Sequence, residues 1–502
     1  MFHQLLSNRS WIAAGFIFVL FIGTACLILE ENPVTGNRRA LGFTWEQELQ
    51  IGRESDEQII AEFGMYDDPV VADYVNTLSK NILQHSHMRR EGTSQQFLDT
   101  PFTFRVLDSD VVNAFALPGG FVYVTRGLMT HLNNEAQLAV VIGHEIAHVA
   151  ARHASQRVFT QQAGSLLLIG GAVLGQELFG MSADNILNIG GTAAQLLFLS
   201  YSREAERESD RLGVEYAAME GYNASEAAEF FRSLRRLSER SSQVLPNHLS
   251  SHPDPGDREA SMHSLSEIWR DRGFPQTIIR EQEYMSIIDG MTVGENPRNG
   301  FMQNSVYYHP ELKFQYPVPS GWRLVNQPTQ VVAFEENQRA VSIFRFAQGA
   351  TNAREAVEQF INQDGISVIN SSRRDVNGIR GHRAIGTATG SDGTNLKFMV
   401  QGLEYEGNIF RFLNYSSEND YGSFESSFNL IANGFNRLDD PEILNIQPVR
   451  IQVVAAPRTG RFESFLPAEM PLGMTKDAFA IMNQLELNDF VTIGQLLKLP
   501  VQ

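Results

Sequence analysis

The sequence His144-Glu145-Ile146-Ala147-His148 lies within a run of apolar and small residues. The flanking pattern predicts one long helix, with Asn134 as its N-cap, Gln137 at the third helical position and an end near Arg157. On such a helix the two histidines share a face, about 6 Å apart along the axis. Both imidazoles can then reach one Zn²⁺, with Glu145 beside the water that completes the coordination. The alternative is a charged stripe on a buried core helix.

A second helical stretch is predicted after an apolar run that ends at Leu199. It carries Glu206 and Asp210, which are four residues apart and therefore share a face. One carboxylate there can be a third zinc ligand, while the other orients a ligand histidine through a hydrogen bond. Acidic pairs at this spacing are common on solvated helices, so the pair alone is weak evidence for a metal site. Together with the motif at 144–148 it is strong evidence. His153 lies half a turn round the first helix from His144, and we expect it to stay outside the site.

Composition limits the kinds of protein that the chain can be. It has 502 residues, so we expect two to four domains. Hydrophobic residues make up 43% and charged residues 20%, a composition that is typical of globular proteins. The formal net charge of −18 argues against nucleic-acid binding, which needs a basic face. The single cysteine excludes an internal disulfide and the Cys₄ and Cys₂His₂ types of zinc site.

Residues 1–29 are predicted to be an export signal. Arg9 precedes an apolar run over 11–29, and two glutamates follow it. Cys26 comes directly after Gly23-Thr24-Ala25, which resembles a bacterial lipobox, where the cysteine is acylated and becomes the mature amino terminus. The run is also long enough to be an uncleaved membrane anchor, and simple cleavage is a third possibility. A lipoprotein or an anchor would tether the chain on the periplasmic side of a membrane in the cell envelope.

A strand pair is predicted at 102–107 and 121–125, with the turn signal Pro118-Gly119-Gly120 between them. The segment Asn113-Ala114-Phe115 precedes that turn.

Several separated motifs together resemble the HtpX/BepA-type gluzincin zinc metallopeptidases, a group that also contains the CAAX prenyl endopeptidases and the mitochondrial Oma-type proteases. The resemblance covers roughly residues 43–289. It rests on the stretches Asn113 to Gly120, Asn134 to Ala139, His144 to His148, Ser202 to Glu206 with Asp210, and Ser251-His252-Pro253.

This resemblance implies a site with one Zn²⁺ per chain. His144, His148 and Glu206 would be the zinc ligands, Glu145 the catalytic base, and Asp210 a hydrogen-bond partner behind the ligands. The resemblance also makes Asn113, Ala114 and Phe115 an edge strand along the substrate cleft. Such an edge can hold an extended peptide through main-chain hydrogen bonds. The alternative for this segment is an ordinary core strand.

The oxyanion formed during peptide hydrolysis needs a protein donor, and the candidates are His252 and Arg203. The alternative for Arg203 is a structural ion pair with a nearby acid. His252 precedes Pro253 in a predicted loop, so it could instead swing onto the zinc and close the site until substrate moves the loop. It could also simply cap a helix.

The expected fold class is multidomain α+β. Residues 43–289 would form a mainly helical zincin-type metallopeptidase domain with a small sheet, followed by a linker at 290–305. Short strands with one helix predict an antiparallel α+β domain at 306–437, which loosely resembles PsbP-like domains. Residues 445–502 look like a small separate module that resembles a degenerate LysM module. That resemblance would place the protein near peptidoglycan, and a structural use is the alternative.

These features together predict an envelope-tethered zinc metalloendopeptidase that degrades unfolded, misfolded or misassembled envelope proteins. One alternative is an envelope chaperone or binding protein with a structural zinc site, although a structural site needs no base such as Glu145. A CAAX-type protease is a second alternative. The lack of several long membrane-spanning segments argues against it.

Overall fold

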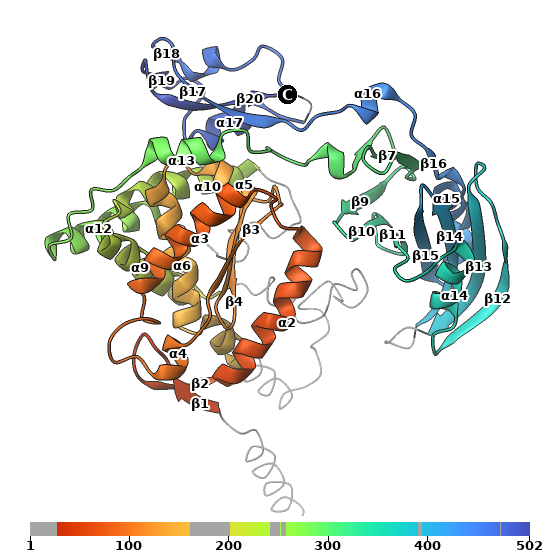
Figure 1. The fold of residues 1–502 in the computed structure, drawn as a ribbon, viewed down its shortest axis with the longest axis horizontal. Coiled ribbons are helices and arrows are strands. Elements are labelled where there is room, and N and C mark those ends of the chain that lie inside the picture. Colours follow the sequence, from red (N-terminus) through yellow and green to blue (C-terminus); the bar gives the residue numbers. More distant parts are fainter. Residues whose placement is uncertain (1–27, 161–200, 241–251, 253–257, 390–393, 472) are drawn as a thin grey trace, which may run out of the picture.

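The computed structural model describes residues 28–160, 201–240, 252, 258–389, 394–471 and 473–502 (Figure 1). The predicted export signal, including Cys26, lies outside these residues apart from Ile28 and Leu29. Among the described helices, none has both the length and the apolar character that crossing a bilayer requires. The mixed α+β composition predicted from the sequence is confirmed.

Residues 28–288, called the N-terminal region below, are mainly helical (Figure 1). Its helices are α2 (Trp45–Phe63), α3 (Pro69–Gln84), α4 (Gln95–Leu98), α5 (Arg126–His131), α6 (Glu135–Ala150), α9 (Arg203–Glu220), η1 (Ala224–Glu226), α10 (Ala227–Arg240), α12 (Arg258–Asp271) and α13 (Glu281–Ile288). Its strands are β1 (Ile28–Glu31), β2 (Arg38–Leu41), β3 (Thr103–Leu107), β4 (Ala114–Leu117) and β5 (Phe121–Thr125).

The small sheet of the N-terminal region has the order β3-β5-β4. Both predicted strands form, but β3 and β5 run parallel, and the turn at 118–120 joins β5 to β4 instead. Gly119 and Gly120 have φ of 79° and 96°, the left-handed backbone that this tight antiparallel turn needs. β4 therefore forms one edge of the sheet and packs beside α6.

Helix α6 is buried along its whole length and packs against α9. As predicted, Asn134 is its N-cap, and the Asn134 side chain accepts a hydrogen bond from the Gln137 backbone N–H. The two helices approach most closely at glycines, since a Cβ on Gly213 would lie 2.7 Å from the backbone N of His144. A Cβ on Gly143 would lie 2.9 Å from the carbonyl oxygen of Gly213. Only the absence of side chains at these two positions allows this backbone contact.

Helix α6 ends at Ala150, seven residues before the predicted end. Arg152 has φ of 59°, which lies in the left-handed region and interrupts the helix. A new helical segment begins at His153, so residues 153–160 do not continue the axis of α6.

Residues 301–437, called the β domain, contain a seven-stranded sheet of order β12-β13-β14-β15-β11-β10-β9 and a four-stranded sheet of order β16-β8-β7-β6. Helix α14 packs on one face through Val357 against Phe398, and α15 packs on another through Phe428 near Met399. The elements are β6 (Phe301–Gln303), β7 (Val306–His309), β8 (Phe314–Pro317), β9 (Trp322–Asn326), β10 (Gln330–Glu335), β11 (Ala340–Phe346), α14 (Ala353–Ile361), β12 (Ile366–Arg373), β13 (Arg380–Thr389), β14 (Asn395–Tyr405), β15 (Asn408–Ser417), α15 (Tyr421–Gly434) and β16 (Asn436–Arg437).

The predicted linker at 290–305 contains the short helix η2 (Pro297–Asn299) and the strand β6, which pairs with β7. The antiparallel sheets of the β domain therefore begin inside that range.

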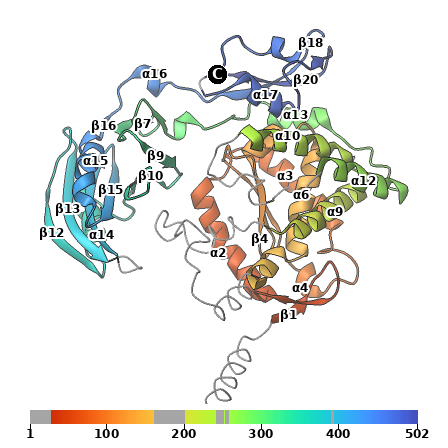
Figure 2. The same ribbon diagram turned by 180° about the vertical axis from the view of Figure 1, so that it is seen from behind.

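Residues 445–502, called the C-terminal module, pack against the N-terminal region at α10 and α13 (Figures 1 and 2). Phe462, Phe479 and Leu497 of the module belong to the same continuous hydrophobic core as α6. The module contains β17 (Arg450–Ala455), β18 (Gly460–Arg461), η3 (Phe462–Phe465), α17 (Lys476–Met482), β19 (Phe490–Val491) and β20 (Leu496–Val501), and α16 (Pro441–Leu444) precedes it.

Candidate metal centre

Four buried side chains converge between α6, α9 and residue 252. His144, His148, Glu206 and His252, called the metal cluster below, each offer one ligand atom within 4.8 Å of the others. The four-residue spacing on α6 places both histidines on the face that meets α9, and Glu206 lies in the first turn of α9. The loop histidine that the sequence singled out therefore joins the motif residues.

The distances within the cluster fit a single small cation. His144 Nε2 lies 3.0 Å from His148 Nε2 and 3.3 Å from His252 Nδ1. Glu206 Oε1 lies 3.1 Å from His252 Nδ1 and 3.4 Å from His148 Nε2. Tetrahedral ligands about 2.1 Å from Zn²⁺ lie about 3.4 Å from one another. The donor set, three imidazoles and one carboxylate, is also the chemistry that zinc prefers in the absence of thiolates.

A carboxylate and a guanidinium lie directly behind the cluster. Asp210 Oδ1 lies 2.9 Å from His144 Nδ1, which leaves His144 Nε2 directed into the cluster. Arg258 donates from Nε to Asp210 Oδ2 at 3.0 Å, and its Nη1 lies 3.8 Å from Glu206 Oε2. Asp210 thus lies between the ring of His144 and the guanidinium of Arg258, and its predicted orienting role stays a prediction.

The electrostatics of the cluster favour a bound cation. Burial would raise the pKa of Glu206, but His252 and the hydrogen bonds from the histidines outweigh burial and hold that pKa well below its usual range. Burial would lower the pKa of His144, but hydrogen bonds and charges from Asp210 and Glu206 raise it to about 9. The carboxylates therefore stay ionised and attract positive charge, which a divalent metal can supply in place of a proton.

Glu145 is fully buried next to the cluster. Neither oxygen of its carboxylate has a hydrogen-bond partner among the described residues, and its Oε1 lies 3.6 Å from His252 Nε2. Burial raises the pKa of this carboxyl above its ordinary value. A buried carboxylate without hydrogen bonds is costly, which fits a group that is completed by a bound water.

The structure differs from the sequence-based expectations at two residues. Arg203, a predicted oxyanion donor, is the exposed first residue of α9, and none of its described contacts is with the cluster. His153 was expected to lie outside the site, yet its Nδ1 lies 3.0 Å from His148 Nδ1. The helix break at Arg152 explains this, because the half-turn argument holds only for an unbroken helix.

The segment predicted to line the substrate cleft leads into β4, which is at an edge of the sheet, and its side chains are covered. Asn113, Ala114 and Phe115 are all buried, and the strand itself begins at Ala114. The backbone of Asn113 pairs with Thr125 of β5, since its carbonyl accepts from the Thr125 N–H at 3.0 Å.

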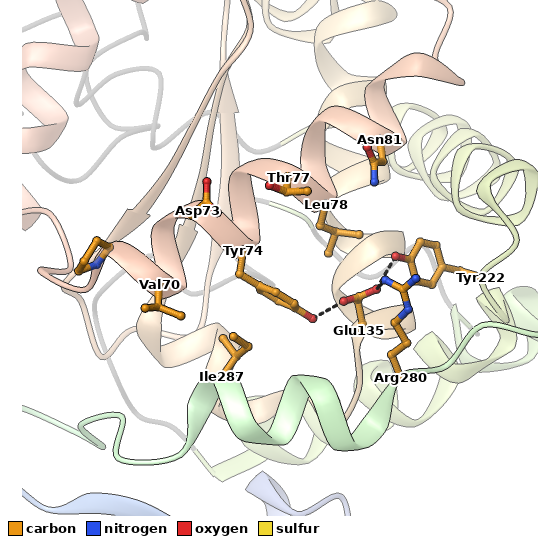
Figure 3. A pocket seen from close by; sticks show the side chains of 11 residues that line it. Val70, Asp73, Tyr74, Thr77, Leu78, Asn81, Glu135, Tyr222, Arg280 and Ile287 are labelled. Carbon is orange, nitrogen blue, oxygen red and sulfur yellow. Dashed lines mark hydrogen bonds and ion pairs between the residues drawn. The ribbon is translucent and has the colours of Figure 1, made fainter.

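A separate pocket lies between α3, α13 and the start of α6 (Figure 3). There Glu135 accepts hydrogen bonds from Tyr74 Oη at 2.6 Å, Tyr222 Oη at 2.5 Å and Arg280 Nη1 at 2.8 Å. Glu135 is the first residue of α6, so these bonds anchor the start of the helix.

A His-Glu-x-x-His helix whose histidines meet a glutamate from a second helix is an arrangement typical of gluzincin-type zinc peptidases. Residues 81–266 match the model described as Peptidase family M48. The resemblance drawn from the sequence motifs is thereby confirmed.

Curated relatives extend the similarity beyond this segment. The beta-barrel assembly-enhancing protease of Escherichia coli is 30% identical over 279 residues, which are 54% of this chain and 54% of that protein. The mitochondrial metalloendopeptidase OMA1 of Danio rerio is 27% identical over 280 residues, 53% of this chain and 56% of that protein. The chain thus spans about half the length of the curated relatives it matches.

Among solved structures, cyanobacterial PsbP from Synechocystis covers 26% of this chain and 91% of its own, with 16% identity and a TM-score of 0.23. The PsbP-like character of residues 306–437 stays a prediction.

Proposed function

We propose that the chain is a zinc-dependent endopeptidase that hydrolyses misfolded or misassembled proteins of the cell envelope. The observation that carries the proposal is the buried Glu145 carboxylate, which has no described hydrogen-bond partner and lies beside four converging ligand residues. A purely structural zinc site would not need this costly group. The match of residues 81–266 to the model of peptidase family M48 supports the same chemistry.

The residues divide the chemistry between them. Bound Zn²⁺ would supply a Lewis acid and lower the pKa of a coordinated water to ~7. His144, His148 and Glu206 would hold the metal, and Asp210 would fix the ring of His144. Glu145 would accept the proton of the attacking water and deliver it to the leaving amine.

His252 has two possible roles in this scheme. Its Nδ1 lies 3.1 Å from Glu206 Oε1, so its imidazole could take the fourth coordination position and exclude the attacking water. Its Nε2 lies 3.6 Å from Glu145 Oε1. After a small movement, the imidazole could instead donate a hydrogen bond to the oxyanion that forms beside Glu145. Its present position within ligand distance favours the first role, a shutter over the metal.

The substrate is proposed to be an extended polypeptide. β4 is an edge strand beside α6, so a peptide added along β4 would run past the catalytic helix. This mode selects unfolded chains, because a folded protein rarely offers an unpaired extended segment. The named function of the Escherichia coli relative, enhancing beta-barrel assembly, supports an envelope protein as the substrate.

We place the protein on the periplasmic side of the envelope, tethered by lipid on Cys26 or by an uncleaved anchor over residues 1–29. Contact of the C-terminal module with peptidoglycan is a weaker proposal. The shared hydrophobic core instead favours a structural role for that module.

Casein cleavage by the full chain tests the proposal. Cleavage should disappear when a chelator removes zinc and return when zinc is added back. The chaperone alternative predicts a different result, in which the zinc-loaded chain binds unfolded casein and leaves it intact.

A further inference from the structure

The break after α6 is held by a buried arginine. Arg152 donates from Nε to Glu48 Oε1 at 2.8 Å and from Nη1 to Glu30 Oε2 at 2.8 Å. Its Nη2 donates to the carbonyl oxygen of Phe43 at 3.1 Å. The Arg152 side chain is fully buried, and its guanidinium lies over the ring of Trp45 at 5.4 Å. A non-glycine residue in left-handed backbone is strained, and these contacts offset that strain.

The segment that follows the predicted export signal, residues 30–43, also stabilises the break after α6. Asn32 Nδ2 donates to the carbonyl oxygen of Ala151 at 2.7 Å, and the backbone N–H of Phe43 donates to Ser155 Oγ at 2.9 Å. Residues on both sides of Arg152 are thus fixed by elements that contain no metal ligand.

The break turns His153 back onto a metal ligand. His153 Nδ1 lies 3.0 Å from His148 Nδ1, while His148 Nε2 faces Glu206 at 3.4 Å. On its other side, His153 Nε2 lies 3.3 Å from Glu208 Oε2, a carboxylate of α9. An unbroken helix would carry His153 away from this position.

We propose that Arg152 and His153 are positioning residues for the ligand His148. Arg152 holds the left-handed turn, the turn places His153, and His153 fixes the ring of His148. The proton arrangement follows from the contacts. Glu208 accepts from His153 Nε2–H, so His153 Nδ1 is unprotonated and can accept from His148 Nδ1–H at 3.0 Å, closer than the 3.3 Å to Ser209 Oγ. His148 must then present its unprotonated Nε2 to the metal.

This inference rests on the proposed function, because it presumes that His148 binds zinc. The test measures zinc affinity of the purified full chain by chelator competition, and the visible spectrum of the cobalt(II)-substituted protein. His153→Ala should raise the zinc dissociation constant by about 10- to 100-fold and change the cobalt spectrum. His153→Asn should recover most of the affinity, because an amide oxygen can accept the His148 Nδ1–H.

Arg152 is tested against a partly exposed arginine elsewhere in the same region, Arg105. Arg152→Met should weaken zinc binding about tenfold or more. Arg105 makes a comparable pair with Asp56, at 2.7 and 2.6 Å, on β3 and α2. Arg105→Met should lower the melting temperature and leave zinc affinity unchanged.

A milder pair of variants covers the case in which the buried substitutions fail to fold. Glu208→Gln should weaken zinc binding several-fold, and Glu204→Gln, exposed on the same helix, should not. Zinc binding by the wild type with unchanged affinity in His153→Ala and Glu208→Gln would overturn the positioning role alone. Absence of zinc binding by the wild type would instead overturn the proposed function.

Discussion

His252 shows how a single side chain could control the site. It comes from a part of the chain far from α6 in sequence, yet its Nδ1 lies 3.3 Å from His144 Nε2. An imidazole at that distance lies where a ligand of the metal would lie, which is the basis of the shutter role proposed above.

If His252 is a shutter, His252→Ala should raise basal casein cleavage while weakening zinc binding. The reason is that the fourth coordination position becomes open to water. The measurement is the initial rate at saturating zinc, with His263→Ala as a control, since His263 is exposed on α12. A fall in kcat by about 10²–10³ would contradict the shutter and assign His252 to the oxyanion.

Residue spacing predicted the part of the site that helical geometry determines. His144 and His148 on α6, and Glu206 and Asp210 on α9, were placed correctly because a four-residue interval fixes a shared face. Arg258 was missed because it is 48 residues from Asp210 and lies on a different helix, a contact that no local pattern predicts. Two acids that are buried close together at 206 and 210 need a cation nearby. This need was the one indication in the sequence that a residue such as Arg258 pairs with them.

At the scale of elements, the site depends on how closely α6 and α9 approach. The glycine contact at Gly143 and Gly213 brings the histidine face of one helix within reach of the glutamate of the other. Sequence patterns predicted both helices but could not predict where they cross. They also missed the break at Arg152, because a left-handed arginine is stabilised by partners at Glu48 and Glu30 rather than by local propensity.

Gly213→Ala tests the helix contact. Alanine normally stabilises a helix relative to glycine by about 1 kcal/mol. Here the new Cβ would lie 2.7 Å from the backbone N of His144, so we expect a loss of about 1–3 kcal/mol and weaker zinc binding. The measurements are urea unfolding and zinc affinity. Gly422→Ala on α15, where the new Cβ meets no atom within 4 Å, is the matched control and should cause no loss. Equal effects of the two changes would show that the close approach of α6 and α9 at Gly213 contributes neither to stability nor to zinc binding.

At the scale of the whole molecule, the C-terminal module completes the N-terminal region. Lys498 is fully buried, and its Nζ donates to the carbonyl oxygens of Thr130 and Leu132 at 2.8 and 2.9 Å. Gln484 Nε2 donates to Gln137 Oε1, in the first turn of α6. The resemblance to a degenerate LysM module predicted a small module here. Its interface with the N-terminal region joins residues far apart in the sequence, which no periodic pattern can predict.

Lys498→Ala should destabilise the protein by about 2 kcal/mol, because it leaves two buried carbonyl oxygens without their donor. Chemical unfolding, followed by a probe in the N-terminal region, measures the effect. Lys476→Ala removes an exposed ion pair with Glu463 in the same module and should change stability by less than about 1 kcal/mol. A Lys498 variant as stable as the Lys476 variant would show that the module is only loosely attached.

The central claim, that this chain is a zinc peptidase with Glu145 as its base, is tested most directly by Glu145→Gln. Zinc content and casein cleavage are measured on the same purified sample and compared with the wild type. The substitution keeps the size of the side chain and removes its ability to accept the proton. We predict a full complement of zinc with nearly all cleavage lost. Cleavage within about threefold of the wild-type rate would contradict the account.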